Sequence, residues 1–334
     1  MFMKYLMIAA ACAAATPAWA EPTHYPLEIE NCGTTQIFAA APERVVTVGQ
    51  TVTETLFALG LADRVKGTSL WFNSVLPEYA VANAQIPRIA DNTPGFEAVI
   101  GKRPDLVATQ YEWMIGAQGA VGTRDQFADL GVATYIVPAD CVGKNNSIGA
   151  DGTRLGSFST ETIYQSVAEL AAIFDVQDKG ATLNADLRSR EEAAVARAQA
   201  LNLHDLSAVV WFSSAEVGLD PFVAGQKGIP AFMLTSLGIR NVVTTDEEWP
   251  AVGWETIARA NPTVIILARM DRRRHAADDI DVKLDFLRTD PVASQMEAVK
   301  QNRIVILDAM EMEPSLRLIE GLEKLTAEME KLAE

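Results

Sequence analysis

The sequence is poor in the side chains from which most metal sites and many active sites are built. Its three histidines, His24, His204 and His275, are widely spaced, and no two stand at the spacing of zinc ligands. The chain also has no nucleophile elbow, no P-loop, no dinucleotide-binding glycine pattern and no cysteine–histidine combination. A metal ion held by the protein itself is therefore not expected, and an enzyme is only a distant alternative.

Cysteine is also scarce. The chain has three cysteines, and one of them, Cys12, lies in an apolar N-terminal segment. The other two, Cys32 and Cys141, are an even pair, which in an oxidising compartment predicts one disulfide. Such a bond would close a loop of about 110 residues and stabilise the fold by roughly 4–5 kcal/mol in the chain-entropy account. The alternative is two separate buried thiols, and a redox pair is not expected because there is no Cys-x-x-Cys spacing.

Long apolar runs are absent apart from a short one at the N-terminus. Residues 5–15 follow the basic Lys4 and precede Ala18-Trp19-Ala20, which places small residues where a signal peptidase requires them. The run is about eleven residues long, which is shorter than the roughly 20 that cross a bilayer. We therefore expect residues 1–20 to be a signal peptide that is cleaved after Ala20, which places the mature protein in the periplasm.

Acidic residues dominate the charge of the chain that remains after removal of the signal peptide. Removal of residues 1–20 from the 334-residue chain leaves 314 residues, enough for two domain-sized cores. Because Lys4 is lost, 27 basic residues then face 44 acidic ones, a formal net charge of −17. Such a surface repels nucleic acid and anionic lipid headgroups, so neither is an expected partner.

Short apolar runs recur along the mature chain and alternate with helical patterns. Runs that are apolar at nearly every position are typical of strands covered on both faces, and their alternation with helices predicts parallel sheets. The predicted strands are Arg44–Gly49, Asp105–Thr109, Ala133–Val137, Ala208–Phe212, Asn241–Thr244, Val264–Ala268 and Ile304–Asp308. The predicted helices include Val52–Leu59, Phe96–Lys102, Asp125–Leu130, Trp254–Ala260 and Val292–Lys300.

The alternation breaks once, near the middle of the chain. Residues 157–178 carry no strand signal; Ser159 and Thr160 are cap candidates, apolar residues follow at helical spacing, and Gly180 is a stop. A second helical pattern follows over Thr182–Leu201. We therefore expect three parts after the signal peptide: an N-terminal lobe (21–156), a connecting helix (157–180) and a C-terminal lobe (181–334).

One short pattern occurs on both sides of this break. Phe96-Glu97 is followed, seven residues after the glutamate, by Pro104 and an apolar strand, and Trp254-Glu255 is followed at the same distance by Pro262 and an apolar strand. The repeated order of aromatic residue, glutamate, helix, proline and strand predicts two related lobes.

The residues that follow each predicted strand are candidate ligand contacts, because ligands of open parallel sheets bind beyond the carboxyl ends of the strands. Aromatic side chains there can stack on a planar ligand, and arginines suit carboxylates or the negative charge of a ferric chelate. The alternatives are core packing for the aromatics and an exposed, solvated loop for the charged run 271–275. The candidates are Trp71, Tyr111, Trp113, Trp211, Phe212, Arg269, Met270, Arg272 and Met310.

Three segments near the N-terminus resemble the start of periplasmic binding proteins for iron–siderophore complexes. They are Tyr25–Gly33, Ala41–Val46 and Thr53–Val65, and the resemblance continues through Phe96–Val107 and Trp254–Leu267 to Ala298–Lys300. It covers nearly the whole mature chain, and the wider group includes cobalamin and haem binders that serve ABC importers. The resemblance implies an α/β fold in which two Rossmann-like lobes with parallel sheets are joined by a single long α-helix, with the ligand held between the lobes.

The resemblance also implies a function. The expected protein is a monomeric substrate-binding protein that hands a ferric siderophore complex to an ABC permease in the inner membrane; cobalamin, haem or another large anionic cofactor precursor is the alternative. No covalently bound cofactor is expected, because the ligand would carry its own Fe(III). In this family one surface glutamate on each lobe meets arginines of the permease, and Glu97 and Glu255 stand at the matching positions. For each, the alternative is a structural role, since a carboxylate in the first turn of a helix favours the helix dipole.

Processing of the N-terminus gives the first testable prediction. Intact-mass measurement of the protein isolated from the periplasm should find a chain that starts at Glu21, and Cys12→Ala should leave this mass and the yield unchanged. The alternative is a lipoprotein acylated at Cys12. A mature mass that includes acyl chains on Cys12, and their loss in the variant, would contradict cleavage after Ala20.

Overall fold

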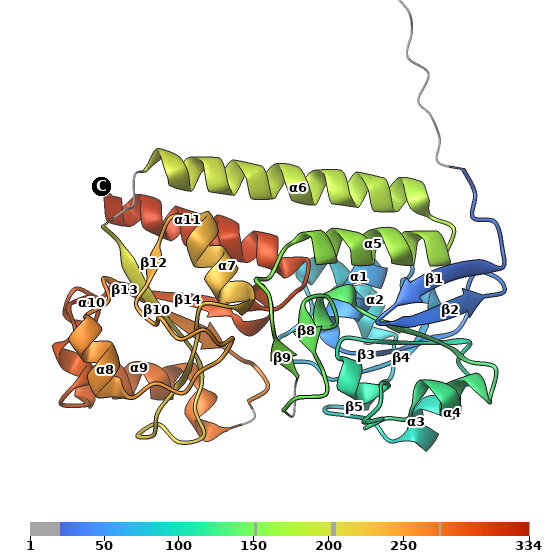
Figure 1. The fold of residues 1–334 in the computed structure, drawn as a ribbon, viewed down its shortest axis with the longest axis horizontal. Helices are drawn as coiled ribbons and strands as arrows, with labels where there is room; N and C mark the ends of the chain where they lie inside the picture. The colour runs from blue at the N-terminus through green and yellow to red at the C-terminus, as the bar shows by residue number, and fades with distance from the viewer. Residues whose placement is uncertain (1–20, 150–151, 202–204, 274, 334) are drawn as a thin grey trace, which may run out of the picture.

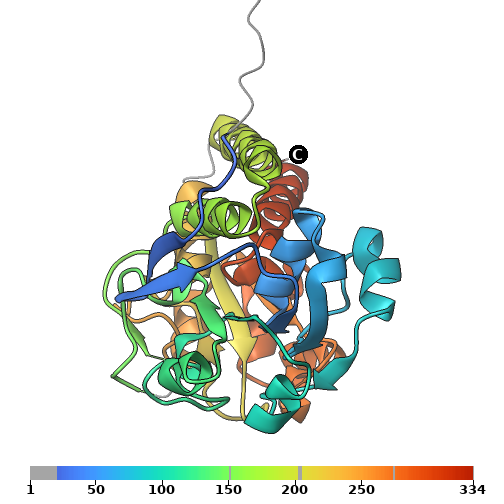
Figure 2. The same cartoon turned by 90° about the vertical axis from the view of Figure 1, so that its right-hand side faces the viewer.

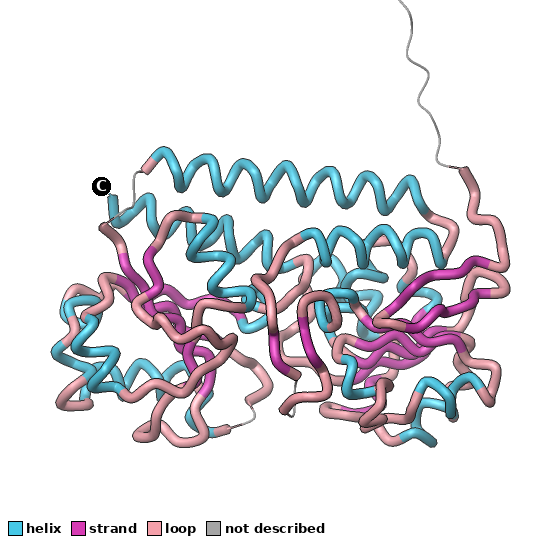
Figure 3. The backbone as a smooth tube through the Cα atoms, in the orientation of Figure 1, coloured by secondary structure: helices cyan, strands magenta, loops and turns pink. Residues whose placement is uncertain are grey.

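The computed structural model describes residues 21–149, 152–201, 205–273 and 275–333. Two α/β lobes lie side by side beneath one long helix (Figure 1). The strands form two separate groups, and helices run along one side of both (Figure 3). The predicted fold class, two Rossmann-like lobes with parallel sheets and one long helix, is confirmed. The predicted signal peptide, residues 1–20, lies outside the described residues.

The first lobe is built on a parallel sheet with a core on each face. In its central strand, Val45 packs with one helical layer, whereas Val46 and Val48 pack with the other. This two-sided burial explains why the strand is apolar at nearly every position. The sheet order is β5 (Arg88–Ala90), β4 (Val65–Ser69), β3 (Val45–Val48), β6 (Leu106–Thr109) and β7 (Ala133–Ile136), and the lobe also contains α1 (Gln50–Ala58), α2 (Ala80–Ala84), α3 (Phe96–Ile100) and α4 (Arg124–Ala128).

The second lobe repeats this plan with a mixed sheet. β10 (Ser207–Ser213), β13 (Val264–Arg269) and β14 (Ile304–Asp308) run parallel. β12 (Arg240–Asn241) pairs in parallel with the start of β10, and β11 (Phe222–Val223) pairs antiparallel with its end. The helices of this lobe are α7 (Gly228–Ser236), α8 (Trp254–Ala260), α9 (Ile280–Thr289), α10 (Glu297–Lys300) and α11 (Arg317–Ala333).

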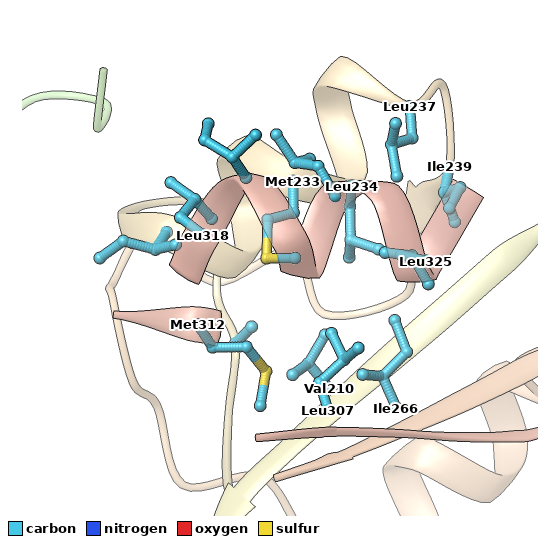
Figure 4. Close-up of a cluster of buried hydrophobic side chains, with 14 of the residues drawn as sticks. Val210, Met233, Leu234, Leu237, Ile239, Ile266, Leu307, Met312, Leu318 and Leu325 are labelled. Carbon is cyan, nitrogen blue, oxygen red and sulfur yellow. The ribbon is translucent and has the colours of Figure 1, made fainter. Parts of the chain in front are cut away.

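One of the two cores of the second lobe lies between its sheet and helices α7 and α11. Val210, Ile266 and Leu307 rise from three neighbouring strands toward Met233 and Leu234 of α7, and Leu318 and Leu325 of α11 close the layer (Figure 4). All of these side chains are almost completely buried. Their burial fixes the strand ends of this lobe relative to α11.

The longest helix of the described residues is α6 (Gln177–Ala200), with 24 residues. It runs along both lobes, against α5 (Glu161–Ile173) at one end and α11 at the other (Figures 1 and 2). Segment 157–180, the predicted connecting helix, holds α5 and only the start of α6, because the chain breaks between them at Asp175, which has a positive φ of 57°. The lobe boundaries at 156 and 181 stay a prediction.

Two other predicted elements are wrong in part. The strand expected over Asn241–Thr244 stops at Asn241, whose side-chain amide donates to the carbonyls of Ala224 and Gly225 and accepts from the amide of Val243, which turns the backbone. The helix expected over Val292–Lys300 is divided into a 3-10 turn and α10 by Met296, which is extended and 1% exposed.

A hairpin that the sequence did not predict covers the outer edge of the first sheet. It consists of β1 (Leu27–Asn31) and β2 (Thr34–Phe38). The Asn31 side chain donates to the carbonyl of Ile136 in β7 and accepts from its amide, at 2.8 and 2.9 Å. Beside it, Cys32 and Cys141 form the predicted disulfide, with their Cα atoms 5.4 Å apart. A second short hairpin, β8 (Lys144–Asn145) and β9 (Thr153–Arg154), follows. Within the described residues, no helix is long and apolar enough to cross a membrane.

Candidate functional site

The two lobes meet where strand-end loops from both sheets come together. The loop Trp71–Ser74 follows β4, and the loop Met270–Arg272 follows β13. The amide of Arg272 donates to the carbonyl of Phe72 at 2.9 Å, and its Nε donates to the carbonyl of Trp71 at 2.5 Å. Asn73 donates to the carbonyl of Arg269 at 3.0 Å and accepts from the amide of Met310 at 3.2 Å. The carboxyl ends of the two sheets therefore share one interlobe face.

The loop Trp71–Ser74 is shaped by the start of α1. The side-chain oxygen of Gln50 accepts hydrogen bonds from the amides of Phe72 and Asn73, each at 3.2 Å. Gln50 reaches this position because the chain turns at Gly49, which has a φ of +127°; a Cβ there would lie 2.3 Å from the Cβ of Gln110. The turn after β3 therefore requires glycine.

A buried ion pair joins the lobes behind this loop. Arg317 at the start of α11 donates to both carboxylate oxygens of Glu54 in α1, with a distance of 2.8 Å from Nε to Oε2. The Arg317 and Glu54 side chains are 4% and 2% exposed, and Arg317 also donates to the carbonyl of Ser74 at 2.7 Å. Burial lowers the pKa of Arg317, but the hydrogen bonds to Glu54, together with the negative charges of Glu54, Glu320 and Asp308, outweigh this effect and raise the pKa.

Four of the candidate ligand contacts are core residues in this structure. Trp71, Trp211, Met270 and Met310 are at most 7% exposed. Trp71 donates its indole hydrogen to Thr68, and Trp211 donates to Ser214 while it packs edge to face on Trp254. Strand-end position alone did not distinguish these buried rings from exposed ones. In this structure all four side chains pack inside the protein.

The other three aromatic candidates are half-buried and paired. Tyr111 and Trp113, after β6, stack with their ring centroids 6.0 Å apart and an interplanar angle of 14°. Phe212, in β10, packs on Trp249 with the centroids 4.6 Å apart. The indole nitrogen of Trp113 is buried and has no hydrogen-bond acceptor within the described residues. Each lobe thus carries one half-buried aromatic pair.

The arginine candidates are held in place by acids and by the first lobe. Arg269 pairs with Asp308, with 2.6 Å between Nη2 and Oδ1. Arg273, in the charged run 271–275, pairs with Asp279. Arg272 reaches across to the first lobe, where its guanidinium lies 5.1 Å from the Phe72 ring and donates to Asn92.

Arg88 in β5 was missed by sequence reasoning. Its guanidinium lies 4.4 Å from the ring of Trp71, close to Arg272. Burial lowers the pKa of Arg88, Asp91 opposes this shift and Arg272 adds to it. The strand β5 has only three residues, which is too short for the period of its side chains to mark it in the sequence.

A buried lysine fixes the strand ends beneath the second lobe's aromatic pair. Lys283 of α9 is 0% exposed, and its ammonium group donates to the carbonyls of Phe212 and Ala268 at 2.6 and 3.0 Å. Burial lowers its pKa to about 8, and the nearby Asp278 opposes this shift. No sequence pattern distinguished this lysine from the exposed charges around it.

The two glutamates of the repeated pattern occupy equivalent places. Glu97 lies in the first turn of α3 after Gly95, and Glu255 lies in the first turn of α8 after Gly253. Both are exposed. The two helices lie at the outer ends of their lobes, on the side away from α6 (Figure 1).

A depression of about 380 Å³ lies elsewhere on the first lobe, beside the disulfide. Its lining includes Glu30, Glu112, Lys144 and Gln165, but none of the candidate ligand contacts. Within the described residues, no group of three or more histidine, cysteine, aspartate or glutamate side chains could hold a metal ion.

Comparison with known proteins agrees with this geometry. The periplasmic binding protein family model matches residues 45–310. A relative from Bacillus subtilis, the uncharacterized ABC transporter substrate-binding lipoprotein YvrC, is 23% identical over 305 residues, which are 90% of this chain and 84% of the relative.

Three solved structures share the fold. A periplasmic binding protein from Veillonella parvula has a TM-score of 0.73 at 23% identity and covers 91% of this chain and 97% of its own. A protein of an ABC-type Fe3+-hydroxamate transport system from Saccharomonospora viridis has 0.71 at 26% identity, with 92% and 99% covered. The periplasmic heme-binding protein RhuT from Roseiflexus sp. RS-1 has 0.66 at 20% identity, with 87% and 99% covered. The chain belongs to the periplasmic binding protein family, whose members bind substrates.

Replacing Lys283 by methionine should change how stability depends on pH. Because burial lowers the pKa of Lys283 from 10.5 to about 8, the unfolded chain binds more protons than the folded protein between these values. The free energy of unfolding of the wild type should therefore rise with pH across this window relative to that of Lys283→Met. Denaturant titrations below, within and at the top of the window measure this difference.

Lys300→Met, at an exposed lysine of the same lobe, is the matched control and should show no such difference from the wild type. If the free energy of unfolding of the wild type minus that of Lys283→Met stays constant or falls as the pH rises, Lys283 is not held with a lowered pKa.

Proposed function

We propose that this protein is the extracytoplasmic receptor of an ABC importer and delivers a large anionic metal chelate, most specifically a ferric siderophore complex, to a permease in the inner membrane. The observation that supports this best is the shared interlobe face. There loops that follow strands of both sheets meet, and Arg272 crosses from the second lobe to the first, in a chain whose formal net charge is −17 without residues 1–20. Arginine at this place in so acidic a protein favours an anionic ligand.

The role of each candidate follows from its exposure. Tyr111, Trp113 and Phe212 are the proposed stacking surfaces, and Arg269 and Arg272 the proposed cationic contacts. Arg88 and Trp249 extend these two sets. Trp71, Trp211, Met270 and Met310 act from beneath, because their side chains are buried. The iron arrives within the ligand, so the protein needs no metal ligands of its own, no covalently bound cofactor and no catalytic group.

A planar macrocycle is the second candidate ligand. Each lobe contributes one half-buried aromatic pair, and two such pairs suit a large flat ring system such as haem better than a compact chelate. Two of the related structures point to the same pair of possibilities by name, since one belongs to Fe3+-hydroxamate transport and one binds heme. Cobalamin belongs to this second class.

The protein is also proposed to be exported and monomeric. Cleavage after Ala20 would release the mature protein into the periplasm. Glu97 and Glu255, one on each lobe, are the proposed contacts with basic side chains of the permease. The pair sits in matching first turns of matching helices, so one symmetric partner could hold both.

A ligand panel tests the proposed class. Ferric siderophores, ferric citrate, haem and cobalamin would be titrated against the purified protein, followed by tryptophan fluorescence and by thermal shift. At least one should raise the melting temperature and change the fluorescence, since binding to the folded state alone stabilises it. Tyr111→Ala with Phe212→Ala should weaken that ligand roughly tenfold, from the loss of two ring contacts.

Phe232→Leu is the matched control, because Phe232 is a half-buried aromatic of α7 that packs on Phe158. It should leave the affinity unchanged. No response to any member of the panel would exclude this ligand class.

Charge reversal tests the docking role. Glu97→Arg with Glu255→Arg should reduce uptake of the ligand found in the panel at least roughly tenfold, because repulsion replaces attraction at both contacts. The affinity of the purified variant for the ligand should stay within about twofold of the wild type, since neither residue lies on the interlobe face.

Glu78→Arg with Glu297→Arg is the matched control: both are exposed acids in the first turn of a short helix, one on each lobe. This variant should transport normally. Equal loss of uptake in both double variants, or loss of ligand binding in the first, would remove the docking assignment.

A further inference from the structure

The hairpin of β8 and β9 lies at the boundary between the two lobes (Figure 1). It carries an arginine, Arg154, whose side chain is only 4% exposed. The Nε of Arg154 donates to the Glu248 carboxylate of the second lobe at 3.2 Å, and its Nη2 donates to the carbonyl of Ala139 at 3.1 Å. Because a guanidinium group holds its donors in one rigid plane, Arg154 fixes the Glu248 carboxylate relative to the backbone that follows β7.

On the first lobe, Asp140 follows Ala139 and holds the loop after β6. The Asp140 carboxylate accepts from the amide of Glu112 at 2.5 Å and pairs with Lys144. The Asp140 side chain is 6% exposed, so little water competes for these bonds. Glu112 is the middle residue of the segment Tyr111–Trp113, whose two rings form the aromatic pair of this lobe. The bond from Glu112 to Asp140 therefore fixes the backbone between the two rings.

Arg154 and Asp140 also act on each other through their charges. Burial raises the pKa of Asp140, whereas Lys144, the amide of Glu112 and the charge of Arg154 lower it. Arg154 thus holds Asp140 in two ways, by its positive charge and by its hydrogen bond to the preceding carbonyl.

On the second lobe, Glu248 precedes Trp249, which packs on Phe212 in the aromatic pair of that lobe. The backbone around Glu248 is closely seated. Its carbonyl accepts from the amide of Gly225 at 3.1 Å, and a Cβ on Gly225 would lie 2.2 Å from the carbonyl oxygen of Glu247. Because this segment is seated so closely, it moves as a unit, and the Trp249 ring follows any movement of Glu248.

We propose that Asp140 and Arg154 are positioning residues that set the two aromatic pairs relative to each other; with Glu248 they form what we call the interlobe bridge. A continuous series of contacts runs from Trp113 through Asp140 and Arg154 to Trp249. The charges of Asp140 and Arg154 are buried and paired, so the bridge acts on a ligand only through the rings. That the rings hold a ligand rests on the proposed function. The coupling between the rings is a property of the protein alone.

Fluorine NMR of protein labelled with 5-fluorotryptophan tests this coupling without a ligand. The chain without residues 1–20 has five tryptophans, so each signal can be assigned by replacing one ring with phenylalanine. Glu248→Gln, on the second lobe, should move the signal of Trp113 on the first lobe by more than its line width. Asp140→Asn, on the first lobe, should likewise move the signal of Trp249. The signal of Trp71, which is buried outside the bridge, should stay in place in both variants.

Glu247→Gln and Asp129→Asn are the matched controls, because each removes one exposed carboxylate charge from the same lobe as the variant that it accompanies. Glu247→Gln should leave the signal of Trp113 in place, and Asp129→Asn should leave that of Trp249 in place. Arg154→Lys keeps the positive charge but loses the rigid fork of donors, so it should move both signals. Thermal melting checks that each variant is folded.

The same bridge should affect binding. Arg154→Lys should weaken the ligand found in the panel roughly tenfold, although Arg154 does not contact it, because the rings are no longer held at the right spacing. Arg44→Lys is the matched control, since the Arg44 side chain also donates to two backbone carbonyls, but within the first lobe. It should leave the affinity unchanged.

The outcomes separate this proposal from the proposed function. If either reciprocal signal stays in place, or if a control moves it as far, the bridge does not position the rings and the proposal is wrong. An affinity that Arg154→Lys leaves unchanged would also overturn it. If both signals move as expected and no member of the panel binds, the coupling stands and only the ligand class fails.

Discussion

The arrangement of the two lobes depends on one close approach of backbone to side chain, at Gly49. Because this residue has no Cβ, the end of β3 can turn against Gln110, and the next residue, Gln50, reaches the loop Trp71–Ser74. The loop held in this way is the surface on which the second lobe rests. The same turn starts α1, which carries Glu54 to Arg317. A side chain at Gly49 would displace all of these together.

The sequence could predict most of the fold because its strands are buried on both faces. Val45–Val48 and Val264–Ala268 read as continuous apolar runs for that reason, and the repeated Glu97 and Glu255 patterns mark equivalent helices. It located the long helix only in part: the predicted helical pattern Thr182–Leu201 lies in α6, but the connecting helix was assigned to 157–180. The buried residues of α6 are few, Gly180, Leu187, Ala194 and Ala198, and ion pairs such as Arg190–Glu323 fasten it to α11, so its apolar period is faint.

The sequence predicted that the candidate residues lie near the ends of strands, but not which of their side chains are exposed. Position after a strand placed Trp71, Tyr111 and Arg272 near the carboxyl ends of the strands, because the carboxyl ends of parallel strands gather at one edge of a sheet. Which ring faces inward depends on side-chain packing against distant helices. The spacing of neighbouring residues in the sequence does not reveal this packing. Trp211 is buried by contacts with Trp254 and Phe286, which lie more than forty residues along the chain.

The hairpin at the start of the described chain affects how the sheet edge can pair with other chains at high protein concentration. An uncovered outer strand is a template on which any extended chain can pair and extend a sheet. At β7 the Asn31 side chain occupies that template, since its amide meets both the donor and the acceptor of Ile136 as a neighbouring strand would. A side chain, unlike a strand, presents no second row of backbone groups behind it. At this residue, therefore, the sheet cannot be extended by pairing with the backbone of another chain.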